Sequence, residues 1–161
     1  MRAFFSDCTR MEIIKAENSD HLILSEIAFL GKSFWGYSPK QLELWREQLT
    51  ITEKYIEENQ VFKLMHAKNI VGFFSIVLHE NKVSEVDFLF MYPKYIGLGY
   101  GKMLIEACIE KSTELNATKI IVDADPHAES FYKYFGFNTY NLLESSIKNR
   151  FLPQMELYIK E

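Results

Sequence analysis

The sequence predicts an α/β protein in which helices flank a central mixed, mostly antiparallel sheet. Two β-rich runs, residues 61–67 and 70–79, are separated only by Lys68-Asn69, which indicates a hairpin. Further along, strand-like and helix-like segments alternate, as in chains that pack helices against a sheet. The 161 residues, 48% of them hydrophobic, suffice for a core without disulfides or a structural metal. We therefore expect an N-terminal extension over residues 1–10 and a single domain over residues 11–161.

The first half of the chain starts with a short strand and continues with helices. Asn18 or Ser19 is expected to cap the first helix, because short polar side chains accept hydrogen bonds from the free N–H groups there. Pro39 suits the first turn of the second helix, where no N–H is needed. The predicted elements of this half are a strand at 12–16 and helices at 20–32, 40–49 and 53–59.

The second half continues the sheet and adds two more helices. Pro93 ends one strand, because proline cannot donate to a strand ladder. Gly136 ends the later helix. The predicted elements of this half are strands at 61–67, 70–79, 83–92, 119–122, 137–143 and 154–159, and helices at 100–115 and 126–135.

Composition and charge argue against several classes of function. The net charge of -4 argues against non-specific binding of nucleic acid, which needs clustered positive charge. No apolar run approaches the roughly 20 residues of a membrane-spanning helix. The histidines show no i, i+4 pair, so we expect no metal site. Cys8 and Cys108 form no disulfide framework, and the start of the chain lacks a signal peptide, so we expect a cytoplasmic protein.

A cluster of glycines lies between a predicted strand and a predicted helix. Gly97, Gly99 and Gly101 let the backbone come close to a ligand, and the helix that follows offers unpaired N–H groups with partial positive charge. Lys94 and Lys102 flank the cluster. The segment therefore predicts a site for a phosphate or pyrophosphate group, and the alternative is a tight turn that binds nothing.

Two common phosphate motifs do not fit this segment. A P-loop would need glycine at position 96 and serine or threonine at position 103, where the chain has Ile96 and Met103. A dinucleotide fingerprint would need glycine at position 102, where the chain has Lys102. The glycine cluster must therefore be interpreted together with another part of the chain.

Residues 123–137 (DADPHAESFYKYFGF) form the second informative segment. The pattern predicts a strand end, a short helix and a glycine stop. Phe131 and Phe135 lie four residues apart and are expected to face the core, whereas Tyr132 and Tyr134 should point elsewhere. For either tyrosine alone, ordinary partial burial is an equally simple interpretation.

Together, the two segments resemble the GNAT superfamily of acetyl-CoA-dependent N-acetyltransferases. The family's loop pattern, Gln/Arg-x-x-Gly-x-Gly/Ala, is matched by Gly99 and Gly101, and the strand ending LFMYP looks like the family's Leu-x-Val-x-Pro. The resemblance in element order covers residues 11 to about 159, and the residue-level match covers about 85–137. The later pattern, Asn-Pro-x-Ala-x-x-φ-Tyr-x-x-φ-Gly-Phe with φ apolar, is matched at Pro126, Ala128, Phe131, Tyr132, Phe135, Gly136 and Phe137.

Two positions depart from the family pattern. Ile96 stands where the family has glutamine or arginine, which removes a polar contact near the phosphates. Asp125 stands where the family has asparagine, so a carboxylate replaces the amide that makes a contact there in the family.

The resemblance implies the GNAT fold, acetyl-CoA as co-substrate and a set of site residues. Tyr132 matches the family's general-acid tyrosine, which protonates the leaving thiolate. A backbone N–H around Met91 would stabilise the oxyanion, and the edge of this strand would pair with the pantetheine arm. The residues expected to bind the cofactor are Leu89, Phe90, Met91, Ile96, Gly97, Leu98, Gly99, Tyr100, Gly101, Lys102 and Asp125.

The attacking amine must lose a proton, and two acids on the strand before the loop could accept it. Glu85 and Asp87 lie two residues apart and therefore on one face of the strand. Either could act directly or through water, and Glu85 is preferred because related sequences often carry an acid there. The alternative for both is an exposed strand face or a salt bridge.

The resemblance places the acceptor near the first two helices. Phe34, Trp35 and Tyr37 could line a pocket for a small organic amine, or they could be packing between helices. The acceptor is expected to be a small-molecule primary amine, and a protein N-terminus or lysine is the second choice. A non-catalytic acyl-CoA-binding module is the alternative from another class, and the apolar C-terminal strands could pair with a second copy of the chain.

Overall fold

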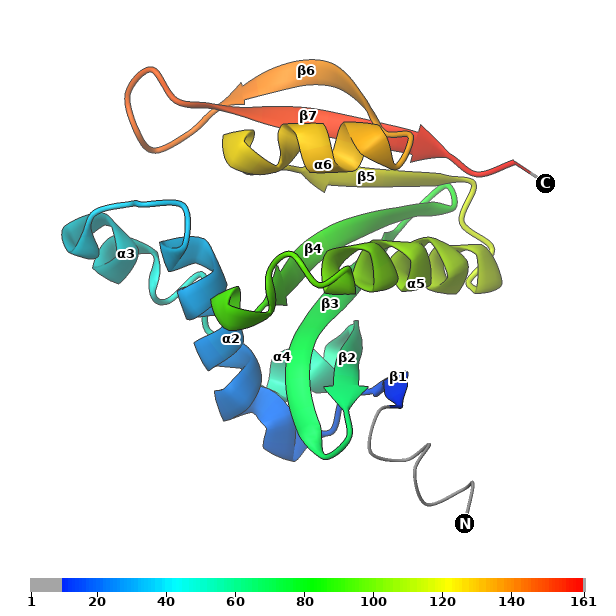
Figure 1. Ribbon diagram of the computed structural model, residues 1–161. Helices are drawn as coiled ribbons and strands as arrows, with labels where there is room; N and C mark the ends of the chain where they lie inside the picture. Colours follow the sequence, from blue (N-terminus) through cyan, green and yellow to red (C-terminus); the bar gives the residue numbers. More distant parts are fainter. Residues whose placement is uncertain (1–9, 161) are drawn as a thin grey trace, which may run out of the picture. The chain divides into compact units, whose positions relative to one another are not determined.

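The structure is a computed structural model that describes residues 10–160 (Figure 1). Apart from Arg10, the expected N-terminal extension, with Cys8, lies outside the described residues. The chain forms two compact units. The first unit holds the chain up to Ser75 together with Phe88–Ala107, and the second holds Ile76–Asp87 together with the chain from Cys108 on.

Within the described residues, the strands form one 7-stranded sheet in the order β1-β2-β3-β4-β5-β7-β6. Strands β1 and β2 are antiparallel, as are β5 and β7 and also β6 and β7, whereas β4 and β5 run parallel. The strands are β1 (Met11–Lys15), β2 (Gln60–His66), β3 (Asn69–His79), β4 (Val83–Met91), β5 (Lys119–Asp123), β6 (Asn138–Glu144) and β7 (Phe151–Tyr158). The prediction of a mixed, mostly antiparallel sheet flanked by helices is confirmed.

The helices occur in the predicted order. The second one ends at Trp45 and continues as hydrogen-bonded turns to Leu49, and the helix expected at 126–135 is divided into two pieces. The helices are η1 (Asn18–Asp20), α2 (His21–Ser33), α3 (Pro39–Trp45), α4 (Glu53–Glu58), η2 (Pro93–Tyr95), α5 (Tyr100–Glu114), η3 (Pro126–Ala128) and α6 (Glu129–Tyr134).

The cap expected for the first helix is wrong. Instead of Asn18 or Ser19, Glu17 and Asp20 form a reciprocal capping box around η1, with the Glu17 N–H donating to Asp20 Oδ2 at 2.8 Å. The same Asp20 oxygen accepts from Lys63 Nζ on β2 at 2.7 Å, and both side chains of this ion pair are nearly buried. The cap therefore also ties the start of α2 to the sheet.

The last strand begins earlier than predicted, at Phe151, because Pro153 is tolerated within it. The ladder between β5 and β7 starts at the pair Asp123 and Gln154, so the missing N–H of Pro153 faces a position just beyond the end of β5. The Pro153 carbonyl still accepts from the Ala124 N–H at 2.9 Å. Proline is tolerated at a strand position whose N–H would not donate a hydrogen bond to the neighbouring strand.

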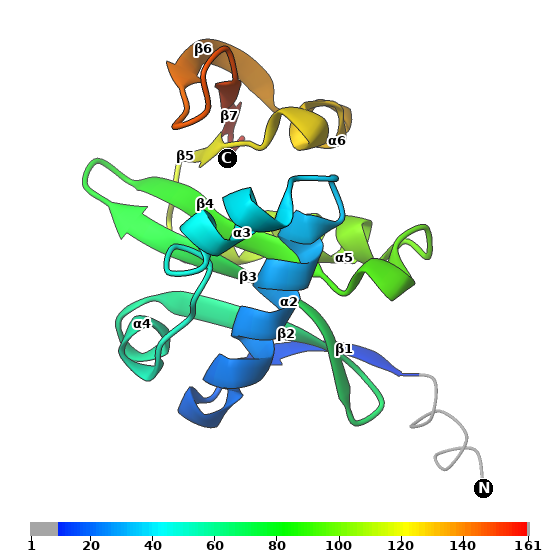
Figure 2. The same cartoon turned by 90° about the vertical axis from the view of Figure 1, so that its left-hand side faces the viewer.

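In the first unit, α2 and the start of α5 cover opposite faces of the end of β4. A Cβ added to Gly31 of α2 would lie 2.7 Å from Cδ1 of Phe90. A Cβ added to Gly72 of β3 would lie 3.1 Å from Leu104 of α5 and 3.2 Å from Cβ of Met91. Since consecutive strand residues point to opposite faces, Phe90 faces α2 and Met91 faces α5. Figure 2 shows α2 crossing in front of the strands of this unit.

In the second unit, α6 lies along the three strands β5, β7 and β6 (Figure 1). Buried apolar side chains of these strands and of the α6–β6 connection form its core, including Ile120, Val122, Met155 and Phe137. Gly136 has φ of +97° and ends the helical segment as expected.

Candidate active site

The glycine cluster forms a turn that links β4 to α5. The Tyr95 N–H donates to the Tyr92 carbonyl at 2.9 Å, and the Ile96 N–H donates to the Pro93 carbonyl at 3.1 Å, which closes η2 before the glycines. Gly97 has φ of +90° and Gly99 has φ of +85°, in the left-handed region that favours glycine. A Cβ on either residue would have no atom within 4 Å. These glycines are therefore required by conformation and not by lack of space.

The surroundings of this turn suit an anion. The first turn of α5 carries no acidic residue, and its N–H groups begin directly after Gly99. Lys94 lies over the rings of Tyr92 and Tyr95, at 5.6 and 5.1 Å from their centroids, and Lys102 lies 3.8 Å from Glu106. The cofactor-binding residues expected between positions 96 and 102 lie on this turn and in the first turn of α5, and all of them are exposed or half-buried.

The end of β4 presents a backbone N–H on the edge that faces away from β3. The Tyr92 N–H donates to the Val71 carbonyl of β3 at 3.0 Å. Because successive N–H groups of an extended strand point to opposite edges, the Met91 N–H points away from β3. The ladder of β4 with β5 covers only the stretch from Val83 to Glu85. The Met91 N–H therefore lies beyond this ladder.

Two glycines that the sequence analysis did not single out shape the end of β4. Besides the contact of Gly31 with Phe90, a Cβ on Gly72 would lie 2.9 Å from the Phe90 carbonyl oxygen, closer than real side chains approach. Glycine inside a helix or a strand often marks such a close approach of backbone, and this signal was present in the sequence. Leu89, Phe90 and Met91 are each half-buried.

The candidate base Glu85 is paired with a histidine. Glu85 Oε1 lies 2.7 Å from His79 Nε2, and the two side chains are 25% and 45% exposed. His79 ends β3 and Glu85 lies near the start of β4, so the intervening hairpin brings them together. Asp87 is exposed. The sequence analysis missed His79, although the hairpin at residues 80–82 was the signal that could have revealed it.

Tyr132 is buried, contrary to the expectation that Phe131 and Phe135 would be the core residues of this helix. The Tyr132 side chain is 6% exposed and packs on the ring of Phe137 at 5.4 Å, whereas both phenylalanines are half-buried and Tyr134 is 82% exposed. The 3-10 helix η3 precedes α6, and Tyr132 lies within α6 together with Phe131.

The Tyr132 hydroxyl is a donor that the described part of the chain leaves unused. Within residues 10–160 it forms no hydrogen bond, and no fully buried side-chain oxygen there lacks a partner, so the hydroxyl oxygen reaches the solvent-accessible surface. Burial, with a smaller contribution from neighbouring Cys108, raises the pKa of Tyr132 well above its ordinary value. The phenol is therefore protonated throughout the physiological range of pH.

Asp125 lies at the N-cap of η3 and contacts several protein donors. Its Oδ1 accepts from the His127 backbone N–H at 2.9 Å and lies 2.7 Å from His127 Nδ1, and its Oδ2 accepts from Arg150 Nη2 at 3.1 Å. The sequence analysis missed Arg150, which is 25 residues away.

Of the three aromatic residues expected at the acceptor site, two contact each other and the third contacts Trp45. Phe34 and Trp35 are 48% and 36% exposed and lie edge to face at 5.2 Å. Tyr37 packs edge to face on the buried Trp45 at 4.8 Å, with Lys32 Nζ over both rings. Tyr37 therefore takes part in packing between helices, whereas Phe34 and Trp35 present aromatic surface to solvent.

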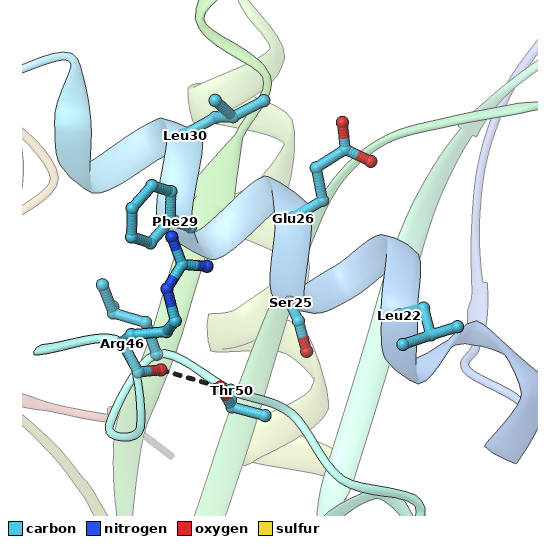
Figure 3. A pocket seen from close by; sticks show the side chains of 8 residues that line it. Leu22, Ser25, Glu26, Phe29, Leu30, Arg46 and Thr50 are labelled. Atoms are coloured by element: carbon cyan, nitrogen blue, oxygen red, sulfur yellow. Dashed lines mark hydrogen bonds between the residues drawn. The ribbon is translucent and has the colours of Figure 1, made fainter. Parts of the chain in front are cut away.

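A cavity of about 300 Å³ lies beside α2, and none of the expected site residues lines it. Its polar groups are already engaged. Thr50 donates to the Arg46 carbonyl at 2.7 Å (Figure 3). The Arg46 side chain also forms two hydrogen bonds to Glu43. Its lining consists of Leu22, Ser25, Glu26, Phe29, Leu30, Arg46, Leu49 and Thr50. This cavity gives no evidence of catalytic chemistry.

The described residues contain neither a metal-binding cluster nor a membrane-spanning helix. Between positions 10 and 160, no cluster of three or more histidine, cysteine, aspartate or glutamate side chains could hold a metal ion. In the same stretch, no helix has both the length and the apolar character needed to cross a membrane.

Comparison with known proteins bears on the family and the fold. The family model described as "Acetyltransferase (GNAT) domain" matches residues 36–155. A comparison with curated proteins finds no significant match. Several solved structures share the fold at low sequence identity.

One similar structure is the PaiA N-acetyltransferase of Thermoplasma acidophilum in complex with coenzyme A, with a TM-score of 0.77 at 18% identity, covering 94% of this chain and 100% of that one. A GCN5-related N-acetyltransferase from Rhodopseudomonas palustris has a TM-score of 0.75 at 19% identity, covering 94% and 98%. The ribosomal-protein-S18-alanine N-acetyltransferase from Escherichia coli has a TM-score of 0.70 at 16% identity, covering 94% and 96%. At these identities the likeness is one of fold.

Proposed function

Because the chain belongs to the GNAT acetyltransferase family, we propose that residues 11–161 act as one N-acetyltransferase domain that moves the acetyl group of acetyl-CoA to a primary amine. The observation that carries this proposal is the turn before α5. Gly97 and Gly99 both have positive φ and open space around them, and the N–H groups of the helix follow at once. Such a turn is suited to wrapping a diphosphate.

Acetyl-CoA supplies a thioester, and the residues of the turn would hold its diphosphate mainly through backbone N–H groups. This mode of binding does not need the glutamine or arginine that Ile96 replaces. Lys94 and Lys102 add positive charge on either side of the turn. That the Thermoplasma acidophilum relative was solved with coenzyme A agrees with this choice of ligand.

The pair of Glu85 and His79 is our candidate for the group that removes the proton from the attacking amine. An amine of pKa ~10.4 must lose its proton before attack, which costs about 5 kcal/mol at pH 7. A carboxylate within 2.7 Å of an imidazole can accept this proton and pass it on to the ring and then to solvent. Asp87 remains the second candidate.

Attack of the amine nitrogen on the thioester carbon forms the C–N bond and leaves negative charge on the carbonyl oxygen. We assign the Met91 N–H to this oxyanion, because it points away from β3 and lies beyond the ladder with β5. The tetrahedral intermediate then breaks its C–S bond, and the electron pair leaves on sulfur.

Tyr132 would act on the leaving sulfur as a hydrogen-bond donor. A thiol has a pKa of ~8.5, so complete transfer of a proton from a phenol to a thiolate is uphill even at the ordinary phenol pKa of ~10. The raised pKa of Tyr132 makes this proton transfer still more unfavourable. The phenol would therefore stabilise the departing thiolate while keeping its own proton. The nitrogen, positively charged after the attack, loses a second proton as the C–S bond breaks, and the thiolate takes up a proton through solvent, which balances the reaction.

We propose a small-molecule primary amine as the acceptor. The exposed pair of Phe34 and Trp35 offers aromatic surface on which a small organic amine could pack. A protein N-terminus is the second candidate, because the similar enzyme from Escherichia coli is described as acting on an alanine of ribosomal protein S18. Pairing with a second copy of the chain stays a prediction.

Release of free thiol from acetyl-CoA over a panel of amines and short peptides tests this function. We expect turnover with at least one amine, and a lower kcat for Tyr132→Phe. Thermal stabilisation by coenzyme A should exceed that by 3′-phosphoadenosine diphosphate, since the latter lacks pantetheine. Binding of coenzyme A without turnover on any amine or peptide would favour the non-catalytic acyl-CoA-binding module. Equal stabilisation by both ligands would contradict the assignment of the strand edge to pantetheine.

A further inference from the structure

Asp125 and Arg150 form a charge pair that no family pattern in the sequence accounts for. The Asp125 side chain is 9% exposed and the Arg150 side chain 14% exposed, with 3.1 Å between Oδ2 and Nη2. A carboxylate so far removed from water requires donors, because an unpaired buried charge is strongly unfavourable. The neutral asparagine of the family pattern would not need such a cation, so the aspartate and the arginine must be explained together.

The arginine lies on a turn that is closed by hydrogen bonds. Arg150 directly precedes β7, where its N–H donates to the Ile147 carbonyl at 3.1 Å and its carbonyl accepts from the Ser145 N–H at 3.0 Å. The Ser145 hydroxyl also accepts from the Ile147 N–H at 3.1 Å. The guanidinium therefore extends from a β6–β7 turn that closes on itself.

The aspartate is held at the start of the helical segment that carries Tyr132. Asp125 Oδ1 accepts from the His127 N–H at 2.9 Å, so this carboxylate caps η3, and α6 continues from it. A second link joins the same segment to the hairpin, because the Thr139 hydroxyl on β6 donates to Glu129 Oε2 on α6 at 2.6 Å. The helical segment is thus linked to the β6–β7 hairpin at two places, the start of η3 and the start of α6.

The position of the Tyr132 hydroxyl depends on where this segment lies. Tyr132 follows Glu129 by one helical turn, and its ring packs on Phe137 immediately before β6. The hydroxyl itself forms no hydrogen bond within residues 10–160, so only the packing of the ring and the placement of the backbone orient it. A displacement of the segment start would therefore move the phenol directly.

We infer that Arg150, acting through the Asp125 carboxylate, is a positioning residue for Tyr132. The inference rests on the proposed function, because it gives Tyr132 a role at the leaving sulfur. It also assigns Asp125 a purpose other than contact with the cofactor: the carboxylate caps η3 and receives a cation from the hairpin. The departure from the family's asparagine is then compensated within the chain by an arginine on the neighbouring turn.

The first test is hydrogen exchange measured by mass spectrometry, which does not depend on catalysis. In Arg150→Gln, amide exchange over residues 126–134 should rise, while exchange over β1 and β2 should stay as in the wild type. The double variant Asp125→Asn/Arg150→Gln, which pairs two amides, should restore most of the protection. Unchanged exchange over residues 126–134 in Arg150→Gln would overturn the inference.

The second test is kinetic and separates positioning from general loss of stability. Arg150→Gln should lower kcat by tenfold or more, up to about 100-fold as expected for a misplaced catalytic group, with KM for acetyl-CoA changed less than threefold. In the Tyr132→Phe background the same substitution should have little further effect on kcat. Equal losses of kcat in both backgrounds would overturn the inference.

The two tests also separate this inference from the proposed function. If the wild type transfers no acetyl group to any amine while Arg150→Gln loosens residues 126–134, the proposed function fails and the structural link stands without its catalytic purpose, which overturns the positioning role. If the wild type is active and kcat of Arg150→Gln is normal, the positioning role fails and the proposed function stands.

Discussion

The two glycines with positive φ in the turn before α5 allow a quantitative test of ligand binding there. Gly97 and Gly99 have φ of +90° and +85°, and an added Cβ would meet no atom within 4 Å. Alanine at either position therefore introduces strain in the backbone and no steric overlap. The cost of holding an alanine in the left-handed region is about 1–2 kcal/mol.

This strain should appear mainly in the affinity for coenzyme A. Gly97 and Gly99 are exposed, so the turn of the free protein can relax away from positive φ in the alanine variants. Binding of the diphosphate would require the original conformation again and would restore the strain. A cost of about 1–2 kcal/mol corresponds to about a five- to thirtyfold weaker Kd. The double variant should lose about the sum of the two single effects.

Isothermal titration calorimetry with coenzyme A measures the effect, and thermal unfolding shows how much of the strain remains in the free protein. Gly36→Ala is a matched control, because Gly36 has φ of +87°, also with no atom within 4 Å, and lies between α2 and α3. The reasoning is refuted if Gly97→Ala and Gly99→Ala bind coenzyme A within twofold of the wild type at unchanged stability. It is also refuted if Gly36→Ala weakens binding equally.

Three further predictions concern stability and pH. Gly31→Ala and Gly72→Ala should each lower the free energy of unfolding by about 1–3 kcal/mol in urea denaturation, because their Cβ atoms would lie 2.7 and 2.9 Å from atoms of Phe90; losses below about 0.5 kcal/mol would contradict the close approach. Because the pKa of Tyr132 is raised, this phenol should stay protonated near pH 10. Any fall of kcat/KM near pH 10 in the wild type should therefore also occur in Tyr132→Phe. Burial raises the pKa of the Cys108 thiol from 9.0 to about 12, so the unfolded thiol ionises first. The free energy of unfolding should therefore fall between pH 9 and pH 12, by about 1.4 kcal/mol per pH unit from this group. Cys108→Ala should flatten that slope, and an identical slope in the variant would contradict the assignment.

The order of the elements could be predicted from the sequence because each element carries local signals. Alternating apolar residues, Pro39 and Pro93 at element ends, and the glycines before α5 all act over a few residues. The start of β7 at Phe151 could not be predicted in this way. Whether Pro153 is tolerated depends on where the neighbouring strand ends, which is a property of the register and not of the local sequence.

The side-chain partners in the candidate site were harder to predict from the sequence, because most of them lie far apart along the chain. Arg150 reaches Asp125 across 25 residues, and no periodicity links them. The pair of His79 and Glu85 spans only a hairpin, so its omission was avoidable. The burial of Tyr132 did not follow from the spacing of Phe131 and Phe135, because the Tyr132 ring packs on Phe137, which lies beyond the end of α6.

The two departures from the family pattern, Ile96 and Asp125, differ in whether another residue must compensate for them. The loss of a polar side chain at Ile96 requires no compensating residue under the proposed binding mode, because the backbone conformation at Gly97 and Gly99 orients the N–H groups that follow them. Introducing a charge at Asp125 is more costly, because a nearly buried carboxylate is unfavourable unless a cation or hydrogen-bond donors lie beside it. In this chain Arg150, on the β6–β7 turn, provides a cation 3.1 Å from the Asp125 carboxylate. Substituting Arg150 should therefore affect this protein through Asp125, and a relative with asparagine at this position should not require the arginine.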